Sequence, residues 1–209
     1  MVHPDFSRED EALALGHGCV CGVDEAGRGP WAGPVVAAAV VLDRHHIPAG
    51  LNDSKKLTEA RRALLFDAIT ASAQVGVGIV SAAEIDTLNI LQATFRTMER
   101  AVSALPLPPR FALIDGNRAP KLSCPCRTVI AGDSLSLSIA AASIIAKVTR
   151  DRIMTEMEQL YPGYGFAAHK GYGTAAHSAA LARLGPCAEH RRSFKPIAAL
   201  LASADGDAR

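Results

Sequence analysis

Val35 to Leu42 form an unbroken run of eight apolar residues, built from valine, alanine and leucine alone. A strand with one solvated face alternates apolar and polar residues, so a run without polar positions is typical of a strand buried on both faces. The run is far too short to cross a bilayer, which needs about 20 apolar residues. We therefore expect a globular protein in which this segment is a buried strand.

Strands and helices alternate along most of the 209 residues. We predict strands at 19–23, 35–42, 75–80, 111–114 and 127–130. Helices are predicted at 7–15, 59–71 (with Thr58 as N-cap), 88–105, 135–160 and 175–184, with a short helix capped by Ser81. This order indicates an α/β fold with a mixed central β-sheet flanked by helices.

The pattern changes after Pro162 to glycine-rich loops, a short helix and the basic segment His190 to Lys195. We therefore expect three parts: a catalytic domain over 1–160, a substrate-binding extension over 161–200 and a flexible tail over 201–209. The N-terminus has neither a basic nor an apolar region of the kind that signals secretion, so a cytoplasmic location is expected.

Charge is distributed unevenly along the chain. Residues 1–115 carry ten Lys or Arg and fourteen Asp or Glu, a net charge of −4, whereas residues 116–209 carry a net charge of +5. An acidic part beside a basic part suits a metal site next to a phosphate-binding surface. Chance asymmetry is the alternative.

Four of the five cysteines form two C-x-C pairs, Cys19 with Cys21 and Cys124 with Cys126. In a strand, Cys19 and Cys21 face the same side as Val23, toward a core. We predict buried free thiols. A zinc site and a disulfide are alternatives, although C-x-C is not the usual zinc-knuckle spacing and a cytosol is reducing.

Carboxylates occur where predicted strands end or a helix begins: Asp24 and Glu25, Asp115, and Asp133. Sites in open α/β sheets form at strand ends, and acids gathered there repel one another unless a cation holds them. Oxygen ligands favour Mg²⁺ or Mn²⁺ over zinc. Two such ions, about 3.5–4 Å apart, can activate a water and stabilise the leaving oxygen of a phosphodiester. Each acid taken alone would more often be structural.

Strand alternation places Asp24 and Glu25 on opposite faces, so both can serve one site only if the strand bends, which Gly27 and Gly29 would allow. Asp133 can also act as the N-cap of the long helix.

Asp151 lies eighteen residues after Asp133. In an unbroken helix the two would be about 27 Å apart. We therefore interpret Asp151, with Arg150 and Arg152, as a surface or packing ion pair.

Several ordered motifs resemble those of bacterial ribonuclease HII, over about residues 18 to 197. They are Asp24-Glu25-Ala26-Gly27-Arg28-Gly29-Pro30, Asp53-Ser54-Lys55-Lys56-Leu57, Ile114-Asp115-Gly116-Asn117, Gly132-Asp133-Ser134, the stretch Ser138 to Asp151, His169-Lys170-Gly171-Tyr172-Gly173-Thr174 and His190-Arg191-Arg192-Ser193-Phe194. Any one motif is weak evidence, but their order together is specific.

The resemblance implies a ribonuclease H-like fold with a small helical C-terminal extension. It also implies that Asp24, Glu25, Asp115 and Asp133 bind Mg²⁺ or Mn²⁺. The loop Gly27-Arg28-Gly29 and Tyr172 would read the ribonucleotide. The expected activity is endonucleolytic cleavage of RNA in RNA–DNA hybrids and on the 5′ side of ribonucleotides in duplex DNA, leaving 3′-hydroxyl and 5′-phosphate ends. Its expected role is ribonucleotide excision.

Physical chemistry agrees with these roles, because only a 2′-hydroxyl marks one ribonucleotide and glycine permits the close backbone approach that reads it. The further candidates for substrate contact are Ser54, Lys55, Lys56, Lys147, Lys170, Arg191, Arg192 and Lys195. For each of these lysines and arginines a solvated surface charge is about as common a role. We expect no catalytic role for His169, His177 or His190.

Two departures from the family pattern are Trp31, where an aliphatic residue is more frequent, and Ala131, where glycine is frequent.

Three other classes of protein compete with this interpretation. Ribonuclease HIII has a large N-terminal domain. A transposase or integrase of the same fold class spaces its acids differently. A non-catalytic hybrid-binding protein needs no full set of acids. A monomer without a sliding-clamp motif is expected.

Overall fold

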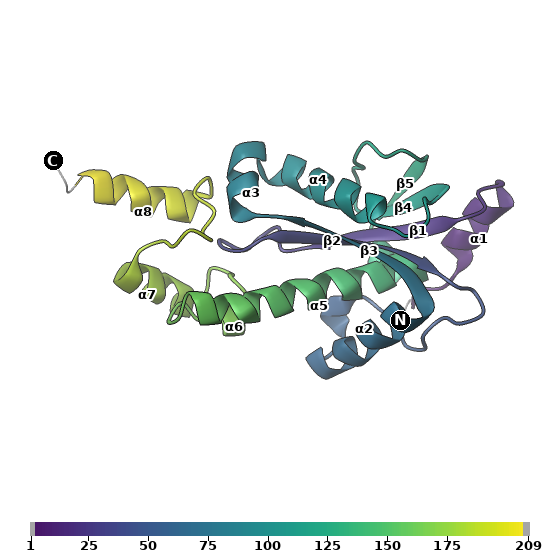
Figure 1. Ribbon diagram of the computed structural model, residues 1–209, viewed down its shortest axis with the longest axis horizontal. Coiled ribbons are helices and arrows are strands. Elements are labelled where there is room, and N and C mark those ends of the chain that lie inside the picture. The colour runs from purple at the N-terminus through teal and green to yellow at the C-terminus, as the bar shows by residue number, and fades with distance from the viewer. Residues whose placement is uncertain (1–2, 207–209) are drawn as a thin grey trace.

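The protein, seen here as a computed structural model that describes residues 3–206, is built on one five-stranded sheet (Figure 1). Its strands are β1 (Val20–Ala26), β2 (Val35–Leu42), β3 (Ala73–Val80), β4 (Phe111–Asp115) and β5 (Cys126–Val129), in the order β3-β2-β1-β4-β5. The pairs β1–β2 and β2–β3 are antiparallel, whereas β1–β4 and β4–β5 are parallel. The predicted mixed sheet is confirmed.

Helices cover both faces of this sheet, as Figure 1 shows, with α3 and α4 on one side and α2 and α5 on the other. The helical elements are α1 (Ser7–Ala14), η1 (Ser54–Lys56), α2 (Glu59–Ser72), α3 (Ala82–Leu88), α4 (Ile90–Ser103), η2 (Gly132–Ser134), α5 (Leu137–Leu160), α6 (Phe166–His169), α7 (Ala175–Leu184) and α8 (Lys195–Gly206).

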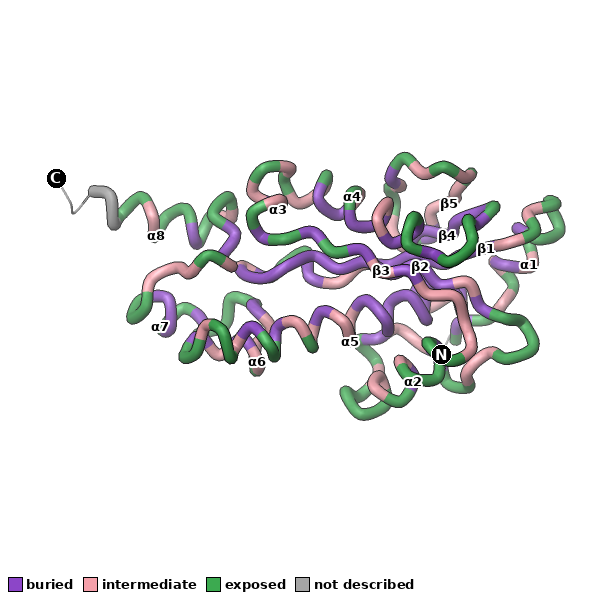
Figure 2. The backbone as a smooth tube through the Cα atoms, viewed as in Figure 1, coloured by how far each residue is buried: buried purple, intermediate pink, exposed green. Residues whose placement is uncertain are grey.

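Strand β2 has the predicted bounds and is buried on both faces (Figure 2). Ala38 and Val40 pack with α2 and α5, whereas Ala37 and Ala39 pack with α4. Helix α5 lies so close to β1 that a Cβ atom added at Gly22 would overlap the backbone of Ser138. Glycine and small side chains in the sheet thus set how closely the long helix approaches the strand that carries Asp24.

Local capping residues define two of the helices as predicted. The Thr58 side chain accepts from the Arg61 N–H at the start of α2, and Ser81 forms a capping box with Glu84 in α3. The helix predicted over 88–105 is wrong at its start. The helical backbone is interrupted at Asn89 (φ 68°), so that Leu88 ends α3 and the longer helix begins at Ile90. Asn89 then caps α4 by accepting from the Leu91 and Gln92 N–H groups.

The C-terminal part has its own apolar cluster, in which Met154 and Met157 of α5 meet Phe166, Leu181 and Ile197. The sequence did not lead us to expect α8, which runs through residues 201–206 of the predicted tail. Residues 207–209 lie outside the described part of the chain. The division into three parts stays a prediction. No helix within residues 3–206 has the length and apolar character needed to span a membrane.

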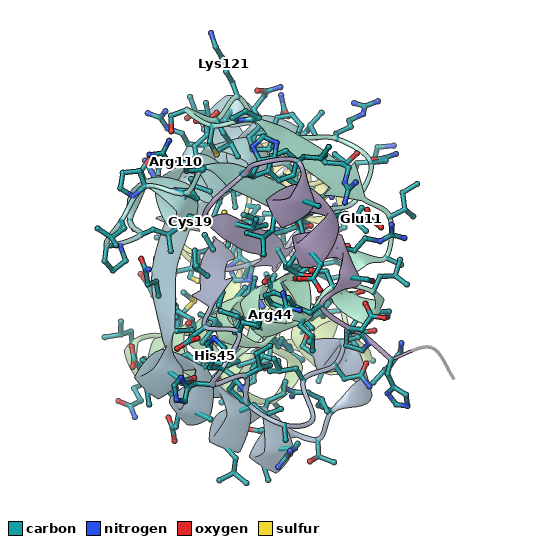
Figure 3. All side chains as sticks on the ribbon, turned by 90° about the vertical axis from the view of Figure 1, so that its right-hand side faces the viewer. Glu11, Cys19, Arg44, His45, Arg110 and Lys121 are labelled. Atoms are coloured by element: carbon teal, nitrogen blue, oxygen red, sulfur yellow. The ribbon has the colours of Figure 1, made fainter. Side chains whose placement is uncertain are left out.

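The cysteines are all unpaired thiols. Cys21 is fully buried with Val23 in the cluster facing α4, against which Cys124 and Cys126 pack as half-buried side chains. Cys19 lies just before β1, at the end of the molecule near α1 (Figure 3). Burial raises the pKa of the Cys21 thiol, and the neighbouring cysteines raise it further. The predicted buried free thiol is confirmed at Cys21, and the disulfide alternative is wrong.

Candidate active site

The carboxyl ends of β1 and β4 lie side by side. Because these strands are parallel and Val23 pairs with Ile114, Asp24 and Asp115 follow at adjacent positions. Asp115 Oδ1 then accepts a 2.7 Å hydrogen bond from the Gly132 N–H, which draws the turn bearing Asp133 to the same edge. A Cβ atom at Gly132 would lie only 3.2 Å from that oxygen, so glycine permits this contact.

The three acids and Glu25 perturb one another electrostatically. Burial raises the pKa of Asp24 well above its ordinary value, and the charges of Glu25 and Asp115 raise it further. Burial also raises the pKa of Glu25, against the opposing effect of Arg28, whose Nη1 lies 3.5 Å from Glu25 Oε1. Burial, followed by the charges of neighbouring aspartates, raises the pKa of Asp133. A cation placed among these groups would relieve this cost.

The donor set fits a hard divalent cation, since every candidate ligand is a carboxylate oxygen. Between residues 3 and 206, no three His, Cys, Asp or Glu side chains already surround one point at ligand spacing. The carboxylates therefore form an open cluster.

Lys55 is a cationic neighbour of these carboxylates. Burial lowers the pKa of Lys55, but the charges of Asp24, Asp133 and Asp53 outweigh that effect and raise it. Sequence reasoning did not single out Asp53 itself, although it begins the Asp53–Leu57 motif.

Strand β1 does not bend at Asp24 and Glu25, the condition under which strand alternation would let both acids serve one site. It stays paired with β2 through Ala26, and the turn begins only at Gly27 (φ +96°). Both acids still face shared space, since one cavity is lined by Asp24 and Glu25, and a second by Glu25 and Asp115.

Asp133 does not take the N-cap position of α5, a role that the sequence allowed for it. It lies in η2, and the Ser136 side chain caps α5 by accepting from the Ile139 N–H. The extra turn of η2 between strand and helix leaves the Asp133 carboxylate free of the capping bond.

The predicted ion pair of Asp151 with Arg150 and Arg152 is also wrong. Asp151 pairs with Lys147 at 2.8 Å. Arg152 instead lies over the Phe66 ring, 4.3 Å from its centroid. Arg150 is buried and donates to the backbone carbonyls of Pro34, Ala32 and Lys170.

Arg191 is fully buried, so its predicted contact with a phosphate is wrong. Its guanidinium donates to the carbonyl oxygens of Gly27 at 2.6 Å, Arg28 at 3.0 Å and Gly33 at 2.8 Å. Burial lowers the pKa of Arg191 to about 9 and that of Arg150 to about 10. Two buried arginines thus hold the loop 27–34 by its carbonyls, a role that sequence reasoning missed.

Tyr172 stands beside this loop with 46% of its surface exposed. A Cβ atom at Gly29 would lie 3.6 Å from the Tyr172 ring, and the Trp31 N–H donates to the Gly171 carbonyl at 2.8 Å. The Trp31 indole packs so closely on Gly173 that a Cβ atom there would overlap it. Trp31, noted above as unusual for the family, therefore supports the tyrosine loop.

A cavity of about 280 Å³ joins the loop and the tyrosine to Asp24 and Glu25. Its lining includes Asp24, Glu25, Gly27, Arg28, Gly29, Ser54, Lys55, Lys147 and Tyr172. Residues from four separate parts of the sequence thus share one concave surface. On the other side of Glu25 and Arg28, a hollow of about 340 Å³ extends past Asp115 to Phe95 and Arg118.

The remaining residues predicted to contact substrate differ in their exposure and in the hydrogen bonds that their side chains form. Lys56 Nζ donates to Ser134 Oγ at 2.8 Å, and Lys170 Nζ donates to Thr155 Oγ1 at 3.0 Å. Ser54 is buried and accepts from Ser143 Oγ. Arg192 and Lys195 are exposed. Substrate contact by these residues stays a prediction.

Ala131 has a left-handed backbone conformation (φ 54°, ψ 40°). That conformation favours glycine, which explains why the family pattern has glycine there.

Two buried histidines, His177 and His190, form a hydrogen-bonded network behind Tyr172. Because a carbonyl oxygen only accepts, His177 Nδ1 donates to the Tyr172 carbonyl at 3.0 Å, and His177 Nε2 then accepts from His190 Nε2 at 3.0 Å. His190 Nδ1 in turn accepts from the Cys187 N–H at 3.0 Å. The His177 Nε2 and His190 Nδ1 atoms can accept only if both imidazoles are neutral, so these side chains support the tyrosine loop structurally.

Acid is expected to destabilise this network. Burial, together with the nearby His177, lowers the pKa of His190 to about 4. Between its ordinary pKa of 6.5 and pH 4, the unfolded chain binds a proton that the folded chain does not, so acid favours unfolding. This histidine alone removes about 3 kcal/mol of stability across that window. Imidazole NMR titration checks the cause: His190 should remain neutral at pH 5.5, and a charged His190 in the folded protein at that pH contradicts the assignment.

A mixed sheet covered by helices, with carboxylates at the ends of two parallel strands, defines a hydrolase of the ribonuclease H-like class. The family model of ribonuclease HII matches residues 21–197. The ribonuclease HII of Parvibaculum lavamentivorans is 59% identical over 199 residues, which cover 95% of this chain and 74% of that relative. The chain belongs to the ribonuclease HII family, and is an endonuclease that acts on the RNA of RNA–DNA hybrids.

Solved structures agree with this assignment. The ribonuclease H2 from Pyrococcus horikoshii OT3 is similar to this chain with a TM-score of 0.76 at 27% identity, over 88% of this chain and 98% of that chain. The PCNA:RNase HII complex from Archaeoglobus fulgidus gives a TM-score of 0.72 at 26% identity, over 85% and 95% of the two chains. The predicted ribonuclease H-like fold is confirmed.

Proposed function

We propose that this chain cleaves on the 5′ side of ribonucleotides embedded in duplex DNA, as well as in hybrids, and that cleavage requires Mg²⁺ or Mn²⁺. The products are a 3′-hydroxyl and a 5′-phosphate, and the role is ribonucleotide excision. One observation carries the proposal: Asp24 and Glu25 of the carboxylate cluster line the same cavity as the loop beside Tyr172. The cytoplasmic location and monomeric state expected above stay predictions.

Asp24, Glu25, Asp115 and Asp133 would hold the cations. A pair of bound divalent ions supplies activation of water and charge stabilisation at the leaving oxygen. The protein's own contribution is to hold the carboxylates in place, through the parallel pairing of β1 with β4 and the bond from the Gly132 N–H to Asp115. Lys55, in the same cavity, offers a positive charge to the phosphate.

Recognition of the ribose would come from the loop Gly27-Arg28-Gly29. The Arg191 guanidinium donates hydrogen bonds to the carbonyls of Gly27 and Arg28 on the inner side of this loop, and these bonds hold the loop in place before substrate arrives. A rigid loop with little side-chain bulk lets backbone groups approach a 2′-hydroxyl. The exposed Tyr172 ring beside Gly29 offers a stacking face for the adjoining sugar or base.

The metal requirement is tested on an RNA–DNA hybrid with protein stripped of metal by EDTA. We expect no cleavage in EDTA and full recovery on adding Mg²⁺ or Mn²⁺. Cleavage that persists in EDTA would remove the metal from the proposal. Titrating each ion in turn gives the preference between the two.

Tyr172→Ala is expected to weaken selection of the junction where RNA gives way to DNA. Loss of one stacking contact costs about tenfold to a hundredfold. The measurement is the ratio of kcat/KM on a duplex with one ribonucleotide to that on a long hybrid. Tyr172→Phe, which keeps the ring, serves as the matched variant and should retain most of the preference. An unchanged ratio in Tyr172→Ala rejects the reading role.

A further inference from the structure

The N-terminal segment packs against the turn that carries Asp133. Asp5 and Ser136 form a β-bridge, in which the Asp5 N–H donates to the Leu135 carbonyl and the Leu137 N–H donates to the Asp5 carbonyl, at 3.4 and 3.1 Å. Ala12 of α1 is buried with Val129 at the end of β5. The segment therefore holds the turn by its backbone and by apolar contact.

Glu9 of α1 adds a buried carboxylate to this contact. It is 1% exposed, and its Oε1 accepts from Ser136 Oγ at 2.6 Å and from the Ser138 N–H at 2.8 Å. Its Oε2 is buried and has no hydrogen-bond partner among the described residues. Burying a carboxylate in this way costs free energy. The cost is reduced by the free N–H groups at the start of α5 and the helix dipole there.

The contacts continue from this turn to the candidate site. The Ser136 N–H donates to the Gly132 carbonyl at 2.8 Å, and the Gly132 N–H donates to Asp115 Oδ1 at 2.7 Å. Ile139 packs on Gly132 closely enough that a Cβ atom there would lie 2.6 Å from Ile139 Cδ1. The turn held by Glu9 thus contains Asp133 and also donates the hydrogen bond that fixes Asp115.

We propose that Glu9 is a positioning residue for the divalent-cation site. Its carboxylate fixes the turn 132–138, so that Asp115 and Asp133 are held at the same edge of the sheet, where an ion would draw them together. Glu9 touches neither substrate nor ion. The inference rests on the proposed function, because it assumes that these aspartates bind the cations.

The test is Mn²⁺ binding, measured by calorimetry on the full chain without substrate. Glu9→Ala should weaken Mn²⁺ binding by about tenfold or more, the usual effect of removing a group that orients metal ligands. Glu9→Gln keeps an oxygen that can accept both hydrogen bonds and should restore binding to within about threefold. The control is Asp10→Ala on the same helix. Within residues 3–206 the Asp10 side chain pairs only with Arg44, an exposed residue at the end of the molecule shown in Figure 3, so its removal should leave binding unchanged.

Amide hydrogen exchange gives a second measurement. The Ser138 and Leu137 amides should lose protection in Glu9→Ala while amides in the central strands keep it. A folded Glu9→Ala protein with Mn²⁺ affinity within about twofold of the wild type overturns the inference. If Glu9→Ala does not fold, the shorter Glu9→Asp takes its place with the same criteria. Absence of Mn²⁺ binding by the wild type would instead refute the proposed function.

Discussion

Asp115→Asn and Asp133→Asn are each expected to reduce cleavage about a thousandfold or more, because metal ions contribute several kcal/mol of transition-state stabilisation. Asparagine keeps the size of aspartate, and its amide oxygen can still accept from the Gly132 N–H, so the fold should survive at position 115. The loss is that of a negative charge at the site. Single-turnover cleavage of a hybrid measures the effect.

Duplex binding should persist in both variants, since the loop 27–34 and the nearby lysines are unchanged. The control is Asp43→Asn, which should cleave at the wild-type rate. Asp43 is an exposed aspartate bonded to His46, and it precedes Arg44 and His45 at the end of the molecule shown in Figure 3. Wild-type cleavage by either Asp115→Asn or Asp133→Asn would remove that residue from the cation site.

Arg191→Met is expected to lower the free energy of unfolding by about 3 kcal/mol or more, since each buried polar group left without a partner costs about 1–3 kcal/mol. The substitution leaves the carbonyls of Gly27, Arg28 and Gly33 without this donor. Urea unfolding gives the value. Because the carbonyls belong to the loop beside the acids, cleavage should fall as well.

Arg192→Met is the matched control, because the neighbouring arginine is exposed and its side chain forms no hydrogen bond within residues 3–206. Its stability should change by less than about 0.5 kcal/mol. If the two variants are equally stable, Arg191 does not hold the loop. If only Arg192→Met weakens duplex binding in a salt-dependent way, the exposed arginine is the phosphate contact.

Local signals predicted much of the fold. The apolar run 35–42 is β2, Thr58 caps α2, and Ser81 caps α3. Each of these features depends on residues close together in the sequence, so it could be predicted. The carboxylates at the ends of β1 and β4 were predictable for a related reason, because parallel strands present their carboxyl ends at one edge.

Contacts between distant residues explain what the sequence could not reveal. Arg191 carries the same charge as Arg192, and only its packing against a loop more than a hundred residues away makes it structural. Ser136 rather than Asp133 caps α5, because η2 inserts a turn before the helix. In sequence, Glu9 resembles any acidic residue of a surface helix. Its structural role comes from hydrogen bonds to Ser136 and Ser138, more than a hundred residues away.

One measurement tests the central claim most directly: mapping the product ends of a DNA duplex that carries a single ribonucleotide. With Mg²⁺ or Mn²⁺ we expect one cut on the 5′ side of the ribonucleotide, with a 3′-hydroxyl on one product and a 5′-phosphate on the other. A duplex left intact with either ion, or a cut on the 3′ side of the ribonucleotide, would contradict the account.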